Sequence, residues 1–237
     1  MKFSRAFSLI EIVLIAGIVA VLIAIALPAL SFVRERSRDA ASLANLRSHA
    51  AIVQMYAGEW RDSFPAITDP AQPYSTLHIQ NYVIEDVPYF HAFYYWQFVL
   101  ADDYYGGVLL HPSVVRPGTG GLLSYHYSCS LIADPRYWDE HTRFGPSQWR
   151  ATRLGEVVFP SHKAVFVESF PTVPYFPEKF SRRRLNLALA DGAAMAASGD
   201  EIMPPVRSGD GLGDGTFHRL GVYGMHTVGG VSGRDLR

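Results

Sequence analysis

The sequence is poor in cysteine and in net charge, and both absences restrict what the protein can be. Cys129 is the only cysteine among 237 residues, so no internal disulfide can form and stability must come from packing or assembly. The 21 basic residues nearly balance the 22 acidic ones, leaving a net charge of -1. Without an excess of positive charge, nucleic acid is not a predicted partner.

Recognisable catalytic motifs are also missing. The nine histidines include no His-Glu-x-x-His pair, and there is no Gly-x-Ser-x-Gly segment. The glycine-rich segment at 117–121 lacks the lysine of a phosphate-binding loop. His126, Cys129 and His141 carry zinc-binding groups, but their spacing matches no zinc motif. The sequence therefore predicts a protein that is not an enzyme and that needs no cofactor.

What the sequence does contain is a long apolar segment close to Met1. Residues 12–30 include no charged, amide or hydroxyl side chain, which is about the length that spans a bilayer as a helix. Lys2 and Arg5 precede the segment, and Glu11 lies at its start. The rest of the chain, after Arg34, has the composition of a soluble domain. The apolar segment thus determines where the protein resides.

Two simple interpretations account for part of this segment. A secretory signal peptide would have a cleavage site at residues 24–26 (Ala-Ile-Ala), but its apolar core would be unusually long. A plain membrane anchor fits the length, although Arg34, Arg36 and Arg38 beyond the apolar run weaken the charge asymmetry that would orient it. Neither explains Glu11, because an ionisable group in a membrane segment is costly and usually functional.

The residues Arg5-Ala6-Phe7-Ser8-Leu9-Ile10-Glu11 resemble the processing site of type IV prepilins and type II secretion pseudopilins. The resemblance implies cleavage by prepilin peptidase between Ala6 and Phe7, followed by N-methylation of Phe7. Counted from Phe7, Glu11 and Pro28 are the fifth and twenty-second residues, where this family has its Glu and often a Pro. Ala6 replaces the usual glycine before the cut, which is the smallest possible change of side chain.

The resemblance implies a structural subunit, a pseudopilin or minor pilin, in a pilus-like or secretion filament. The expected partners are prepilin peptidase, other pilin subunits and the inner membrane, with the N-terminus cytoplasmic and the C-terminal domain extracytoplasmic. The expected segments are a leader (1–6), a transmembrane assembly helix (7–33), its amphipathic continuation (34–60) and a globular domain (61–237). A membrane-anchored binding or hydrolytic domain that uses the helix only as an anchor is the alternative.

The expected fold class is α+β, with the long helix packed on a small antiparallel sheet. In the continuation of the helix, one apolar stripe recurs at spacings of three and four residues. Its members are Leu43, Leu46, Ala50, Val53, Ala57 and Trp60. A second helix is predicted at 91–100, within a stretch of aromatic residues interpreted as core. Strands are predicted at 124–127 and 164–167, and the Asp191-Gly192 pair predicts a hairpin after 185–190.

The C-terminal region offers weaker signals. A strand followed by Asp-Gly resembles the end of a prepilin-type class with a His-x9-Asp-Gly signature, but Ser181 occupies the histidine position. Asp210 and Asp214 have the spacing of two ligands in a calcium loop, yet the middle ligand and the distal glutamate are missing. Calcium is therefore only a secondary hypothesis. The glycine-rich tail, 220–237, suggests an edge strand or a subunit contact.

Overall fold

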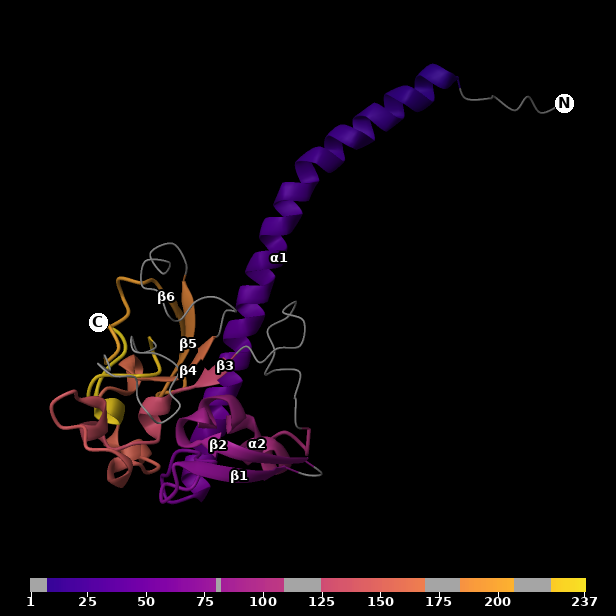
Figure 1. Ribbon diagram of the computed structural model, residues 1–237. Coiled ribbons are helices and arrows are strands. Elements are labelled where there is room, and N and C mark those ends of the chain that lie inside the picture. The colour runs from indigo at the N-terminus through magenta and orange to yellow at the C-terminus, as the bar shows by residue number, and fades with distance from the viewer. Residues whose placement is uncertain (1–7, 80–81, 109–124, 169–183, 207–222) are drawn as a thin grey trace. The chain divides into compact units, whose positions relative to one another are not determined.

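The computed structural model describes residues 8–79, 82–108, 125–168, 184–206 and 223–237 (Figure 1). The chain divides into two compact units, Met1–Ala40 and Ala41–Arg237. Helix α1 (Leu9–Glu59) contributes its first part to one unit and its second part to the other. The described structure is α+β: one long apolar N-terminal helix together with small antiparallel sheets, as the sequence predicts.

The first part of α1 is apolar on all sides. Its large hydrophobic side chains between Leu9 and Val33 are exposed, so this part buries no core of its own. It is long and apolar enough to cross a membrane. Pro28 lies inside the helix and has no N–H to donate to the carbonyl of Ala24. The Ser31 hydroxyl donates to the Pro28 carbonyl at 2.8 Å, which caps a backbone acceptor in the same turn.

The second part of α1 carries the predicted stripe into the core of the larger unit. Leu46, Ala50, Val53 and Ala57 are all buried, at the expected spacings of four, three and four. The prediction is wrong for Trp60, which is 55% exposed. The reason is that α1 ends at Glu59, so the helical periodicity no longer applies to the next residue. Burial of the polar side chains of Ser42 and His49 on the same face was not predicted.

The two buried polar residues of α1 are hydrogen-bonded to aromatic side chains of the domain. Tyr125 Oη donates to Ser42 Oγ at 3.1 Å, and His49 Nδ1 lies 2.5 Å from Tyr105 Oη. Such pairs remove the cost of burying polar atoms and fix the rotation of the helix about its axis, because each needs one defined partner. The stripe is therefore a mixed apolar and polar seam.

A β-hairpin follows α1 and leads into a second helix. Strands β1 (Tyr74–Ile79) and β2 (Tyr82–Pro88) pair antiparallel, with an irregularity between Ser75 and Leu77. This hairpin was not predicted, because the register shift breaks the alternation that marks a strand. The 3-10 turn η1 (Tyr89–His91) and helix α2 (Ala92–Tyr104) confirm the predicted second helix, which is longer at its C-terminal end.

The main sheet has four antiparallel strands in sequential order, β3-β4-β5-β6. They are β3 (Tyr125–Tyr127), β4 (Ala164–Glu168), β5 (Leu185–Leu189) and β6 (Ala194–Ala197). The predicted strands and the Asp191-Gly192 hairpin are thus confirmed. Gly192 has a φ of 90°, which a glycine adopts without strain. Strands β3, β4 and β5 are buried along their whole length, so the sheet is part of the core.

Short 3-10 turns packed on an aromatic core lie between β3 and β4, and another follows β6. The turns are η3 (Cys129–Leu131), η4 (Pro135–Trp138), η5 (Pro146–Gln148), η6 (Leu154–Glu156), η7 (Pro160–His162) and η8 (Gly230–Ser232). Among the core rings, Tyr89 stacks on Trp149 with centroids 4.7 Å apart, and Phe90 stacks on Tyr137 at 5.3 Å. The interpretation of the aromatic stretch as core is thereby confirmed for Tyr89, Phe90, Phe93, Trp96 and Tyr105, all of which are buried.

The end of the chain is built into the core. The described part of the predicted tail, residues 223–237, forms no strand; it has turn η8 and a single bridge between Leu236 and Ile202. Met225, Val231 and Leu236 are buried. The prediction of an edge strand is therefore wrong for this segment, because its apolar residues are too widely spaced to follow a strand's period of two.

Candidate functional site: the start of helix α1 and a buried lysine cluster

The first turn of α1 is held by a reciprocal pair of hydrogen bonds between Ser8 and Glu11. The Ser8 backbone N–H donates to Glu11 Oε2 at 2.8 Å, and the Glu11 N–H donates to Ser8 Oγ at 3.3 Å. This is a capping box, in which a serine and a glutamate three residues later satisfy two backbone donors at a helix start. Glu11 therefore has a local structural role, and its carboxylate lies at the beginning of the apolar helix.

The other sequence-predicted residues near this turn are only partly described. Ala6 and Phe7, the predicted cleavage and methylation residues, lie outside the described residues, as do Asp210, Asp214 and Ser181. Pro28 lies 17 positions beyond Glu11 in the same helix, and both side chains are exposed. The structure therefore places Glu11 and Pro28 on one continuous helix, and among the described residues their polar contacts stay within the first turn and the Pro28 turn.

A second polar site lies in the interior of the domain, around Lys163. Its ammonium group donates to Ser130 Oγ at 2.6 Å, to Asp235 Oδ2 at 3.1 Å, and to Thr227 Oγ1. Lys163 is 0% exposed and Asp235 is 2% exposed. Burial lowers the pKa of Lys163, and the neighbouring Asp235 carboxylate opposes that shift. The three acceptors equal the three N–H donors of an ammonium, so the buried charge is fully hydrogen-bonded.

The Asp235 carboxylate is equally well satisfied. Its Oδ2 also accepts the backbone N–H of Ala164 at 2.9 Å, and its Oδ1 accepts the Thr227 hydroxyl at 2.6 Å. The participants come from η3, the start of β4 and the C-terminal segment. No local motif predicts the cluster, because Lys163 lies 33, 64 and 72 positions from Ser130, Thr227 and Asp235. The cluster fastens the C-terminal segment to the main sheet.

A serine beside a lysine also resembles a nucleophile and its base. Ser128 Oγ lies 2.7 Å from Ser130 Oγ, which in turn accepts from Lys163. All three side chains are 0% exposed, so a substrate has no access to them in this conformation. An ammonium that donates three hydrogen bonds also has no lone pair with which to accept a proton. The geometry thus supports an interior ion pair rather than a catalytic site.

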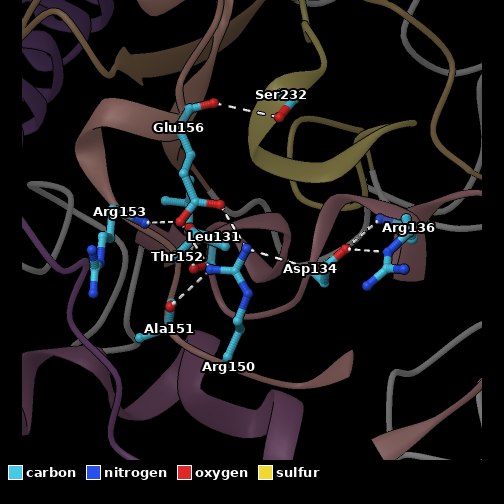
Figure 2. Close-up of polar contacts among 9 residues, drawn as sticks. All are labelled: Leu131, Asp134, Arg136, Arg150, Ala151, Thr152, Arg153, Glu156 and Ser232. Carbon is cyan, nitrogen blue, oxygen red and sulfur yellow. Dashed lines mark hydrogen bonds and ion pairs between the residues drawn. The ribbon is translucent and has the colours of Figure 1, made fainter. Parts of the chain in front are cut away.

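A third polar group, half-exposed, joins two of the 3-10 turns (Figure 2). Arg150 makes a bidentate pair with Glu156, with Nη1–Oε1 and Nη2–Oε2 distances of 2.8 and 2.6 Å, and its Nη2 lies 3.4 Å from Asp134 Oδ2. The hydrogen bonds from Arg150 lower the pKa of the Glu156 carboxyl. Figure 2 shows the Arg150 guanidinium between the two carboxylates, with Arg136 on the far side of Asp134. The group is structural, because its charges are directed at one another.

The histidine and cysteine groups weighed as zinc ligands do not gather. His126 is buried against the rings of Phe93 and Tyr94, and Cys129 Sγ lies 3.7 Å from the carbonyl of Phe90. His141 is exposed on a separate turn. In the described part of the chain, no group of three or more His, Cys, Asp or Glu residues is arranged to hold a metal ion.

Comparison with known proteins gives no match: no protein-family description, no curated protein and no solved structure is similar to this chain at a significant level. The class that the fold itself defines is an α+β protein with one N-terminal helix long and apolar enough to span a membrane.

Proposed function

We propose that the protein is a pilin-like subunit, a pseudopilin or minor pilin, processed before Phe7 and built into a filament through helix α1. The observation that carries the proposal is the combination of a fully exposed apolar helix with a single carboxylate, Glu11, at its start. Exposed apolar side chains along residues 9–33 must be covered by lipid or by other helices. Before assembly the membrane lipid would cover these side chains, and in a filament the helices of neighbouring subunits would cover them.

Glu11 supports the proposal because its carboxylate can accept further hydrogen bonds. Its Oε2 is used by the Ser8 N–H, but a carboxylate has two oxygens and can accept several further bonds. Cleavage before Phe7 would create a charged amine within one turn of this carboxylate. In an apolar filament core, that amine and the Glu11 of a neighbouring subunit would each be costly alone and tolerable as a pair. The pair would set the axial register between subunits.

The first test is the mature N-terminus. Co-expression with a prepilin peptidase is expected to give a chain that begins at N-methylated Phe7, as shown by intact mass and N-terminal sequencing. Ala6→Gly should be processed faster, since glycine is the usual residue before the cut, whereas Ala6→Glu should remain unprocessed. A mature chain beginning at Met1, or near Leu27, would overturn the proposal in favour of a plain anchor or a signal peptide.

The second test separates helix capping from subunit pairing. Glu11→Gln keeps a residue that completes a capping box but removes the charge, whereas Ser8→Ala removes the capping hydroxyl and keeps the charge. We expect Glu11→Gln to insert into the membrane and fail to appear in sheared filaments, and Ser8→Ala to assemble. Assembly by Glu11→Gln together with failure of Ser8→Ala would show that Glu11 acts only as a cap.

A further inference from the structure

Trp60 differs from the other three tryptophans in its exposure to solvent. Its side chain is 55% exposed, whereas Trp96, Trp138 and Trp149 are between 0 and 6% exposed. Tryptophan is the largest side chain, and one placed in water forgoes a large gain from burial. Trp60 therefore invites the question of what covers it.

The surroundings of Trp60 are aromatic and acidic. The ring of Tyr56 stacks on that of Trp60, with an interplanar angle of 15° and centroids 5.7 Å apart. The ring centroid of Tyr104, from α2, lies 6.3 Å from that of Tyr56. The Tyr104 hydroxyl donates to Glu59 Oε2 at 2.5 Å. The Glu59 carboxylate is exposed and oriented by this bond. Two parallel rings thus lie next to a fixed acceptor of hydrogen bonds.

The backbone that carries Trp60 is held in place. The Trp60 N–H donates to the Tyr56 carbonyl at 2.9 Å, and the Trp60 carbonyl accepts the Ser63 N–H at 3.0 Å. Arg61 and Asp62, which follow, both have left-handed backbone angles (φ 56° and 62°), unusual for residues other than glycine. Such strain is retained where the surrounding structure over-determines it and is common at binding sites. The rings are therefore pre-arranged, which lowers the entropy lost on binding.

From these contacts we infer that Trp60, Tyr56, Tyr104 and Glu59 form a platform that binds a neutral polysaccharide. The apolar C–H faces of sugar rings pack on flat aromatic rings, and their hydroxyls donate to carboxylates, so the platform offers both kinds of contact. The exposed carboxylates of Glu59, Asp62 and Asp103 outweigh the neighbouring exposed guanidinium of Arg61, so an anionic chain is disfavoured. A quaternary ammonium is the less suitable occupant, because a cation is best held by rings that surround it, and here the two nearest rings are parallel.

The tryptophan distribution provides the assay. Since the other three tryptophans are buried, quenching of fluorescence by acrylamide reports mainly on Trp60. The full-length protein would be placed in lipid nanodiscs, which avoids detergents with sugar headgroups, and titrated with cellohexaose, maltohexaose and chitohexaose. We expect at least one of these to protect Trp60 from quenching in a saturable manner. The inference does not depend on filament assembly, so the two proposals can fail separately.

Amino-acid substitutions test whether the platform is the part of the protein that binds the hexasaccharide. Binding measured by calorimetry should weaken about tenfold in Trp60→Ala, the loss of one good contact, and less in Trp60→Phe, which keeps an aromatic face. Glu59→Gln should also weaken it, since a neutral amide accepts less strongly. Phe144→Ala is the matched control: Phe144 is 87% exposed, lies elsewhere on the domain and should not matter. No protection by any hexasaccharide, equal binding by Trp60→Ala, or protection only by tetramethylammonium would overturn the inference.

Discussion

The Nζ atom of Lys163 lies 3.1 Å from Oδ2 of Asp235 in the interior of the domain, with both side chains removed from water. The two residues are 72 positions apart, so the pair closes a long loop of chain onto the main sheet. A buried pair of this kind is no proof of high stability, because desolvation cancels much of the attraction. Removing only one of the two side chains is nevertheless strongly destabilising, because the other charge then stays buried without a counter-charge.

The first prediction concerns this pair. Lys163→Met should destabilise the domain by about 3–5 kcal/mol, because Asp235 is left buried and unpaired. The double variant Lys163→Met/Asp235→Leu should recover most of that loss, since it removes both charges. Urea unfolding followed by tryptophan fluorescence measures both. If the single variant were as stable as the parent, the pair would not be a structural fastening.

A second prediction uses two glycines with opposite surroundings. Gly230 has a φ of 58°, and a Cβ there would lie 2.5 Å from Trp138 Cδ1, so Gly230→Ala should cost about 3 kcal/mol from overpacking and backbone strain. Gly58 lies in α1 with nothing within 4 Å of its Cβ position, so Gly58→Ala should stabilise by up to about 1 kcal/mol. Thermal unfolding of the two variants side by side would check the contrast. Equal effects would contradict it.

A third prediction concerns acid. Burial lowers the pKa of His126 from 6.5 to about 4, and burial together with the charge of Arg143 lowers the pKa of His226 to about 3. Below pH 6.5 the unfolded chain therefore binds protons that the folded chain does not. The two histidines should therefore not lower the unfolding free energy well above pH 6.5. As the pH drops toward 4, the unfolding free energy should fall by up to about 1.4 kcal/mol per pH unit for each histidine.

The variant that tests this is His126→Phe, whose ring suits a site between Phe93 and Tyr94. It should reduce the slope of unfolding free energy against pH between 6.5 and 4.5. In the same variant, the dependence above pH 7.5 should match the parent. An unchanged slope in the acid range would mean that His126 is not kept neutral by the fold.

A fourth prediction follows from the left-handed residues after Trp60. Arg61→Gly should stabilise the domain by about 1 kcal/mol, because glycine adopts φ near 56° without a Cβ penalty. Met55→Gly, inside α1 and with an exposed side chain, is the control and should destabilise by a similar amount. Chemical unfolding of both distinguishes backbone strain from a general effect of added glycine.

Local sequence patterns predict several parts of the molecule. The apolar segment, the buried positions from Leu46 to Ala57, the helix around Trp96 and the Asp191-Gly192 hairpin all follow from periodicity and turn chemistry, which act over a few residues. The capping box of Ser8 and Glu11 was not predicted, although it too is a short-range motif. The prediction failed for Trp60 because its spacing fits the apolar stripe but it lies beyond the last residue of α1, where helical periodicity no longer applies.

The sequence by itself determined the long apolar helix, its lone acid and the α+β character of the chain, because hydrophobic periodicity and helix-start chemistry are local. Only the tertiary structure decided that Lys163 meets Asp235, that His49 meets Tyr105, and that Glu59 meets Tyr104. These contacts join residues that are 72, 56 and 45 positions apart, respectively. Such encounters depend on how whole elements pack, which no spacing in the sequence records.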